Sequence, residues 1–198
     1  MAVELETLLR GAEANLRRYG RLAPVVIIEG RDVTTILDVG GIWGPTSGDR
    51  RRLLYRLGML LGFGLDAGRA IAVFDGYHRV DPGDTMRPLP ASGSLEDDPA
   101  ARDAIFVVEM KADGGRVLVE PYDKIVNLDG TTFIFEPAIG GTGFATSGTF
   151  AEFWRGLREV EGVMRLGAQQ HGEPLERARE IVARQFPLFF PGVRQVVE

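Results

Sequence analysis

The sequence predicts an α+β fold in which about six mostly antiparallel strands form a mixed sheet packed by amphipathic helices. Three observations lead to this prediction: β-rich runs occur in pairs separated by short turns, other segments place apolar residues at helical spacing, and no βαβ alternation of the nucleotide-binding kind is present. With 198 residues and 44% hydrophobic content, the chain can bury a sizeable core. We therefore predict one domain over residues 1–168, followed by a C-terminal helix and arm over residues 169–198.

The N-terminal part predicts a helix followed by a hairpin. Residues 3–19 form the amphipathic pattern, and Gly20 stands in the stop position. One side of this helix is apolar and the other is charged, the apolar side with Leu5, Leu8, Leu9, Ala12, Leu16 and Tyr19, and the charged side with Glu6, Arg10, Glu13 and Arg17. Val25–Glu29 and Val33–Val39 then flank Gly30-Arg31-Asp32, a spacing typical of a tight β-hairpin.

The middle of the chain predicts a Leu-rich helix, a buried strand and a long loop. The helix begins near Ser47 or Asp49, either of which is a suitable N-cap, and its apolar stripe contains Leu53, Leu54, Leu57, Leu60 and Leu61. Ala70–Phe74 is apolar at nearly every position, so we expect a central strand that ends at Phe74. Residues 81–101 are rich in proline and acids without any regular period, which predicts a loop that is either functional or disordered.

The following segment predicts two more hairpins. Ile105–Met110 and Val117–Glu120 flank Asp113-Gly114-Gly115, and a similar pair of runs, Tyr122–Asn127 and Thr131–Glu136, flanks Leu128-Asp129-Gly130. Short turns of this kind join neighbouring antiparallel strands. The sheet is therefore expected to grow mainly through hairpins.

The C-terminal part predicts two helices and an apolar arm. Thr149-Phe150-Ala151-Glu152 has the form of a capping box, and Pro174 suits the first position of a helix that ends at Gln185. The arm follows between two prolines, which cannot continue the helix. Exposed apolar groups mark contact surfaces, so we predict partner-binding residues at Phe186, Leu188, Phe189 and Phe190.

Composition limits the possible partners and the compartment. The net charge of −5 disfavours binding to nucleic acid or to an anionic membrane through bulk electrostatics. No apolar run approaches the roughly 20 residues of a membrane span, and acids interrupt the first twenty residues where a secretory signal would be apolar. The chain contains no cysteine, which excludes disulfides and thiolate chemistry. We predict a soluble cytoplasmic protein without a cofactor.

The best candidate for a catalytic or ligand-binding site is the end of the strand over residues 69–78. Asp75, Tyr77 and His78 follow the apolar run, and carboxylate with imidazole is a sensible set of ligands for a divalent metal. Residues three apart on an extended strand point to opposite faces, so Asp75 and His78 could act together only if the chain turned at Gly76. A polar strand end that runs into a loop explains the same residues, and we do not predict a metal site.

A glycine-rich segment, residues 139–149, follows a strand and precedes a helix. Backbone amides in this position could hold an anion, with Gly141, Gly143, Ser147 and Thr149 as candidate ligand-binding residues. The segment lacks the lysine of a phosphate-binding loop, and a flexible connection capped by Thr149 explains it equally well. No serine stands in the pattern of a nucleophile elbow. Acids near strand ends, which include Glu29, Asp38, Asp75 and Glu109, leave paired-carboxylate chemistry open.

The order of these elements resembles a group of small α/β proteins of bacteria and their phages that have no assigned activity. The resemblance covers about half of the chain, through Ala70–His78, Asp97-Asp98-Pro99 and Ile105–Tyr122. It implies an accessory or virion-associated role and transfers no functional residue.

These observations predict a non-enzymatic interaction or assembly protein that uses its apolar C-terminal arm to bind another subunit or a partner. The absence of any complete catalytic set favours this interpretation. The alternative is a small-ligand-binding protein or a metal-assisted hydrolase with its site at the end of the strand over residues 69–78. The sequence does not identify the ligand that such a site would take.

Overall fold

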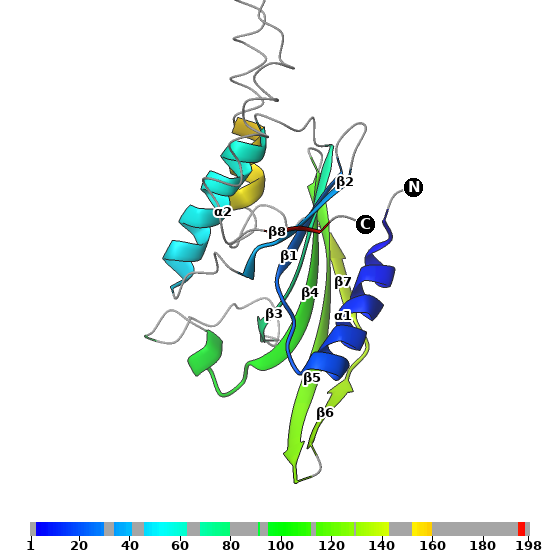
Figure 1. Ribbon diagram of the computed structural model, residues 1–198. Helices are drawn as coiled ribbons and strands as arrows, with labels where there is room; N and C mark the ends of the chain where they lie inside the picture. Colours follow the sequence, from blue (N-terminus) through cyan, green and yellow to red (C-terminus); the bar gives the residue numbers. More distant parts are fainter. Residues whose placement is uncertain are drawn as a thin grey trace, which may run out of the picture. The chain divides into compact units, whose positions relative to one another are not determined.

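The computed structural model describes residues 3–29, 34–40, 46–62, 68–79, 91, 95–111, 114–128, 130–142, 152–159 and 194–196 (Figure 1). The chain divides into two compact units, each made of separate segments. Residues 1–23, 73–107 and 117–141 form the first unit, and residues 24–72, 108–116 and 142–198 form the second. Both units draw on residues 1–168, where the sequence predicts one domain.

The first unit packs one helix on a sheet. Helix α1 (Leu5–Tyr19) ends where Gly20 adopts a left-handed conformation with φ of 70°, and the Gly20 N–H donates to the Leu16 carbonyl at 2.8 Å. The predicted helix and its stop are therefore confirmed. The buried side of α1 consists of Leu5, Leu9, Ala12, Glu13 and Leu16.

The position of Glu13 corrects the sequence prediction. We expected Glu13 on the solvent side, but it is only 6% exposed, and Tyr19 of the predicted apolar side is exposed instead. Helical spacing predicts the edge of a buried face only to within about one residue. Glu13 follows Ala12 at the border between the apolar and the charged face. Whether a border residue is buried depends on the surface that the helix packs against.

The sheet of the first unit has the strand order β6-β5-β4-β3, and β7 also pairs with β5. Its strands are parts of β3 (Arg69–His78), β4 (Arg102–Lys111) and β5 (Gly114–Asn127), together with β6 (Gly130–Phe135) and β7 (Ile139–Thr142). The buried residues of these strands include Ile105, Val107, Leu118 and Tyr122. In the same unit, the only described pieces of the predicted 81–101 loop are Ala91 and residues 95–101, which include a short 3₁₀ helix over Leu95–Asp97.

The predicted hairpin of β5 and β6 is confirmed, but Gly130, which was predicted to belong to the turn, pairs with Asn127 as the first residue of β6. Six residue pairs join the two strands one for one, from Tyr122 with Phe135 to Asn127 with Gly130. Gly130 has a φ of 131°, a conformation that residues with a side chain rarely adopt. The two predicted strands on either side of Pro121 are one continuous strand, because the Pro121 carbonyl still accepts the Glu136 N–H at 2.9 Å.

The second unit contains the other edge of the strand order, β4-β3-β1-β2-β8. β1 (Val25–Glu29) pairs antiparallel with β2 (Thr34–Asp38), which confirms the predicted N-terminal hairpin. β8 (Arg194–Val196) pairs antiparallel with β2 through Ile36, Leu37 and Asp38. The α+β fold class predicted from the sequence is thus confirmed.

Helix α2 (Ser47–Gly62) of the second unit begins one residue after its cap. The Thr46 hydroxyl accepts the Asp49 N–H at 3.1 Å and bonds to the Asp49 carboxylate at 2.6 Å. The predicted caps, Ser47 and Asp49, are therefore wrong as caps. Thr46 stands three residues before Asp49, the spacing at which an N-cap hydroxyl accepts a backbone N–H of the first helical turn.

α2 packs closely against the helical residues 152–159. These residues belong to the helix that the capping box at Thr149–Glu152 predicted. A side chain at Gly58 would collide with the carbonyl of Phe153, and one at Gly156 would collide with the carbonyl of Tyr55. Glycine at both positions lets the two backbones approach. The Tyr55 hydroxyl and Glu159 form a hydrogen bond of 2.8 Å beside this contact. Among the helices of the described residues, none is long and apolar enough to cross a membrane.

Candidate functional site

β3 holds the residues that the sequence singled out, and it is longer than predicted. The strand continues through Gly76 to His78, so the predicted end at Phe74 is wrong. Phe106 of β4 explains why the strand stays extended. Its ring stacks on Phe74 with a centroid separation of 5.1 Å, and it lies 3.4 Å from the position that a Cβ on Gly76 would take.

The structure does not bring Asp75 and His78 together. Side chains alternate along a strand and no turn interrupts β3, so the two residues point to opposite faces. Burial, reinforced by the charge of Asp103, raises the pKa of Asp75 although a hydrogen bond to its own backbone opposes the change. Burial alone lowers the pKa of His78, without any influence from Asp75.

Asp75 lies in an acidic and aromatic neighbourhood on its face of the first unit. Burial raises the pKa of Tyr77, and the charges of Glu96, Asp103 and Asp75 raise it further. Tyr122 is buried, and its pKa is raised by burial first and then by Asp103 and Asp75. These influences favour a cationic over an anionic ligand. Across the described part of the chain, no group of three His, Asp or Glu side chains could hold a metal ion.

His78 has one feature that a ligand could use. Its Nε2 atom is buried and finds no hydrogen-bond partner among the described residues. Burial lowers the pKa of this imidazole and so favours its neutral form. A buried nitrogen without a partner costs free energy, which a bound group could recover.

Arg79 fixes the end of β3 to the described part of the 81–101 loop. Its Nη1 donates to the Asp98 carboxylate at 2.6 Å, and both side chains are largely buried. Asp98 also accepts the Ala100 N–H at 2.9 Å. Asp98, which the sequence analysis named only within Asp97-Asp98-Pro99, therefore has a structural role.

Most of the other predicted site residues lie outside the described residues. This holds for Gly143, Ser147 and Thr149 of the glycine-rich segment and for Phe186, Leu188, Phe189 and Phe190 of the apolar arm. Gly141 is described and belongs to β7. The residues that follow the arm, Arg194–Val196, pair with β2 of the same chain.

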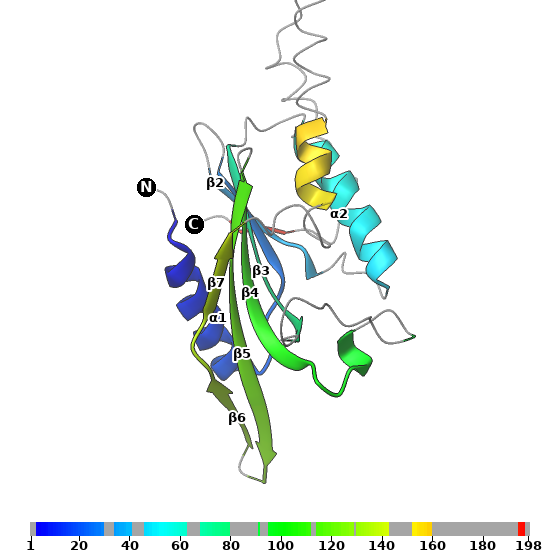
Figure 2. The same cartoon turned by 180° about the vertical axis from the view of Figure 1, so that it is seen from behind.

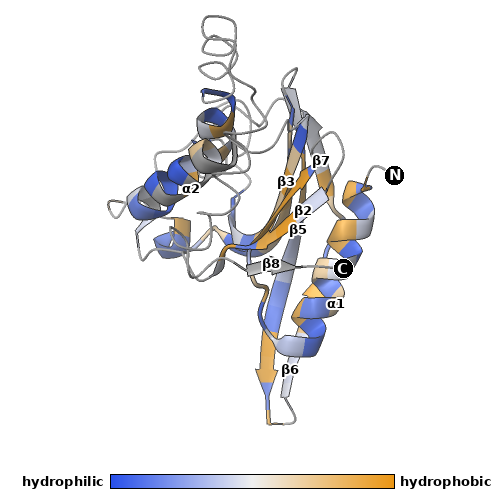
Figure 3. Cartoon of the chain, turned by 45° about the horizontal axis from the view of Figure 1, so that its top comes forward, coloured by the Kyte–Doolittle hydropathy of each residue, from blue (hydrophilic) through white to orange (hydrophobic). Residues whose placement is uncertain are grey.

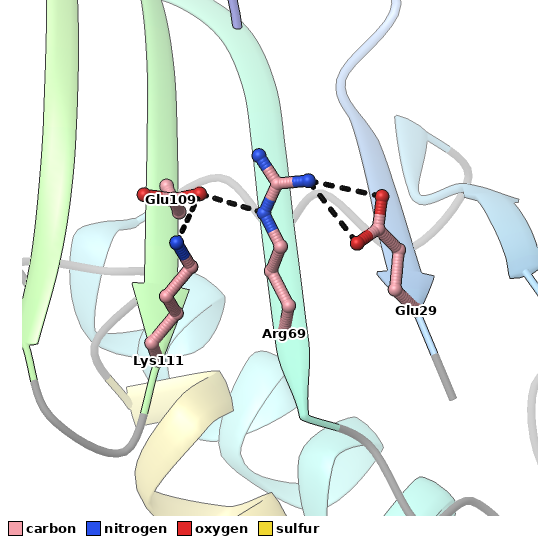
Figure 4. Close-up of polar contacts among 4 residues, drawn as sticks. All are labelled: Glu29, Arg69, Glu109 and Lys111. Atoms are coloured by element: carbon pink, nitrogen blue, oxygen red, sulfur yellow. Dashed lines mark hydrogen bonds and ion pairs between the residues drawn. The ribbon is translucent and has the colours of Figure 1, made fainter. Parts of the chain in front are cut away.

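Two of the strand-end acids belong to a cross-strand ion network in the second unit (Figure 4). Arg69 of β3 donates from Nε to Glu109 at 2.6 Å and from Nη1 to both oxygens of Glu29 at 3.0 and 3.1 Å. Lys111 lies 3.0 Å from the same Glu109 oxygen. Burial acts to raise the pKa of Glu109, but hydrogen bonds from Lys111 and Arg69 outweigh it and lower the pKa. These four charged side chains join β1, β3 and β4. Glu29 and Glu109 both bind Arg69, so they do not form a carboxylate pair for acid–base chemistry.

A different acidic cluster, which the sequence analysis missed, lies in the first unit. Glu13 of α1 and Glu120 of β5 are 6% and 2% exposed, and Arg10 forms ion pairs with both. Burial raises the pKa of Glu120, the charge of Glu13 and a hydrogen bond to it raise the pKa further, and Arg10 opposes the change. Glu120 Oε2 is buried and has no partner among the described residues. No pattern within either segment signals this pair, because Glu13 and Glu120 come from distant parts of the chain.

The hairpin of β5 and β6 exposes an apolar surface that we call the hairpin arm, residues 123–128 and 130–134. Along β5 the side chains change from buried to exposed at Asp123. Figures 1 and 2 show that the two strands extend beyond the end of α1, and Figure 3 shows hydrophobic residues at the end of β5. Val126 is 71% exposed, and the exposed large apolar side chains of the arm are Ile125, Val126, Leu128 and Ile134.

Comparison with known proteins gives no relative for this chain. No family model, no curated protein and no solved structure matches it.

Proposed function

We propose that this chain is a non-enzymatic interaction or assembly protein. The observation that carries the proposal is the hairpin arm, where four large apolar side chains are exposed together around one turn. Single exposed apolar residues are common, but several exposed large apolar side chains on one short hairpin indicate a contact surface. Cross-strand pairing places Ile125 opposite Thr132 and Val126 opposite Thr131, so both faces of the hairpin offer apolar groups.

The arrangement of the buried acids supports the same proposal. Glu29 and Glu109, which sequence reasoning left open for acid–base chemistry, both bind Arg69. Hydrogen bonds from Lys111 and Arg69 lower the pKa of Glu109, which makes this carboxylate a poor general base at neutral pH. The docking role of Phe186, Leu188, Phe189 and Phe190, the cytoplasmic location and the phage or mobile-element association stay predictions.

The alternative function, a ligand or metal site at the end of β3, has less support. With Asp75 and His78 on opposite faces, a site would use either the acidic face of Asp75 or the unpartnered Nε2 of His78, but not both. The acidic face disfavours phosphates and other anions. A thermal shift with an organic cation or a divalent ion, absent from an Asp75→Asn variant, would favour this alternative.

Photo-crosslinking of the full chain tests the proposal. A benzophenone amino acid that replaces Leu128 is expected to give a discrete covalent adduct, because this side chain is fully exposed at the tip of the arm. The matched control is the same probe at Arg21, which is exposed on the first unit but outside the arm. If purified protein and cells that make it give no discrete adduct at Leu128 beyond the Arg21 control, the proposed contact surface is wrong.

A further inference from the structure

The outer edge of β6 is the strongest unexplained surface of the first unit. β6 stands at the end of the strand order, and the described strand that pairs with it is β5. Backbone groups along a strand point alternately to its two sides. The side of β6 away from β5 therefore presents N–H and carbonyl groups to which another strand can bind.

The sequence of β6 contains none of the usual protections of an exposed edge. Natural edge strands avoid pairing by means of charged side chains, proline or a bulge. Gly130–Phe135 has neither a charged residue nor a proline, and its pairing with β5 runs one for one without a bulge. An unprotected edge of this kind is expected where the edge is covered by a partner strand.

The charges beside β6 are balanced. Arg102 donates to Glu136 at 2.6 Å and to Asp123 at 2.9 Å, so these two acids share one guanidinium. Lys124 adds a second positive charge on β5. Arg17 of α1 also lies beside β6, 4.6 Å from the centroid of the Phe135 ring, and pairs with Glu13, so charges of both signs lie near this strand. Although the whole chain has a net charge of −5, two copies that meet here bring no excess of like charge together.

We propose that the occupant of this edge is β6 of a second copy of the chain, paired antiparallel about a two-fold axis at Thr132. This inference rests on the proposed interaction function and names its partner. An antiparallel edge is complementary to itself, so a two-fold dimer needs only this one strand. Paired residues share a face, so the axis places Ile134 opposite Gly130 of the second copy. Ile134 of each copy then lies diagonally beside Thr132 of the other copy, on the face that Ile125 shares.

An introduced cysteine reports this geometry directly because the natural chain contains no cysteine. At Thr132 the two Cα atoms would lie about 4.5–5.5 Å apart, within the range that a disulfide bridges. Thr132→Cys is expected to form a covalent dimer under mild oxidation. Asn127→Cys is the matched control, since it is exposed on the same hairpin but lies on the inner strand, and it is expected to stay monomeric.

A charge variant tests the edge without oxidation. In sedimentation experiments at about 100 µM, the natural chain is expected to approach twice its mass of 21.7 kDa, as a modest strand-edge interface allows. Thr132→Lys with Ile134→Lys puts protective charges on the edge and is expected to give a monomer. Thr7→Lys with Ala14→Lys puts the same charges on exposed positions of α1, outside the hairpin arm, and is expected to retain the dimer. Circular dichroism checks that both variants fold.

Three results would overturn the inference. They are a monomeric natural chain at this concentration, a dimer that the β6 lysines leave intact, or equal crosslinking at positions 127 and 132. Photo-crosslinking at Leu128 distinguishes failure of the second-copy inference from failure of the proposed interaction function. An adduct with a different protein overturns only the second-copy inference, whereas no adduct together with a monomer overturns both.

Discussion

Glu109 in the second unit and Glu120 in the first are both 2% exposed strand residues, yet their pKa values change in opposite directions. Burial acts to raise both pKa values, but Lys111 and Arg69 reverse the effect at Glu109, whereas the charge of Glu13 reinforces it at Glu120. Two equally buried carboxyl groups can therefore differ in how readily they ionise. The partner that a neighbouring element brings decides whether a buried carboxyl group is ionised.

The two clusters also differ in how completely their atoms are paired. In the Arg69 network, two acids and two bases join three neighbouring strands, and Glu29, Arg69 and Glu109 are mostly buried. In the Glu13 and Glu120 pair, the nearby cations are Arg10 and Arg17, whose side chains are 64% and 58% exposed, and Glu120 Oε2 has no partner among the described residues. The first cluster favours the ionised form of Glu109, and the second favours the protonated form of Glu120.

The largest effect is expected from Arg69→Met, which removes the centre of the balanced cluster. Glu29 and Glu109 would lose their shared partner, and breaking a buried ion pair from one side costs about 3–5 kcal/mol. Urea unfolding at pH 7 measures the loss. Arg102→Met is the matched control, because Arg102 also binds two carboxylates but is exposed, and its loss should be much smaller. Equal losses in the two variants would contradict the structural role of Arg69.

A smaller effect with the opposite sign is expected from Glu120→Gln. The pKa of Glu120 is higher in the folded chain than in the unfolded chain, so the folded state binds the proton more tightly. Its contribution to stability is complete below the unfolded pKa and is lost as the pH rises through the folded pKa. The uncharged Gln avoids this loss, so the variant should be more stable than the natural chain by on the order of 1 kcal/mol at pH 8.

Unfolding measured from pH 4 to pH 8 checks this sign. The gap between variant and natural chain should widen as the pH rises. Glu109→Gln provides the contrast, because the lowered pKa of Glu109 gives a contribution that is present above the unfolded pKa and lost as the pH falls. A gap for Glu120→Gln that narrows with rising pH would show that the Glu13 and Glu120 pair does not hold a proton.

The smallest effect is expected from Lys111→Met. Glu109 keeps its hydrogen bond from Arg69, and the Lys111 side chain is 42% exposed, so the loss should be below about 1 kcal/mol. The pKa of Glu109 should rise, since one of the hydrogen bonds that lower it is removed. An NMR titration of the Glu109 carboxyl carbon measures this change. An unchanged titration would mean that Arg69 alone controls the ionisation of Glu109.

Local sequence patterns predicted most of the described fold. The Gly20 stop, the N-terminal hairpin and the turn before Gly130 each follow from neighbouring residues, because capping and turn formation are local interactions. The predicted end of β3 at Phe74 was wrong for a non-local reason. A change from apolar to polar residues suggested an end, but stacking of Phe106 from β4 keeps the strand extended to His78.

The candidate surfaces depended far more on tertiary structure. The apolar contact surface that the sequence predicted, the C-terminal arm, lies outside the described residues. The residues of the exposed hairpin arm were predicted only to form strands. Alternation along β5 and β6 indicates which residues share a face, but not where the cover of α1 stops. No pattern in the chain could show that Val126 is exposed.

By itself, the sequence determined the α+β class, the hairpins and the turn positions, since these depend on conformational preferences of residues close together in the chain. Tertiary structure alone decided that Glu13 meets Glu120, that Arg69 joins Glu29 to Glu109, and that β6 ends its side of the sheet. Burial and ionisation are properties of a surrounding that distant segments build together, and no local pattern contains that information.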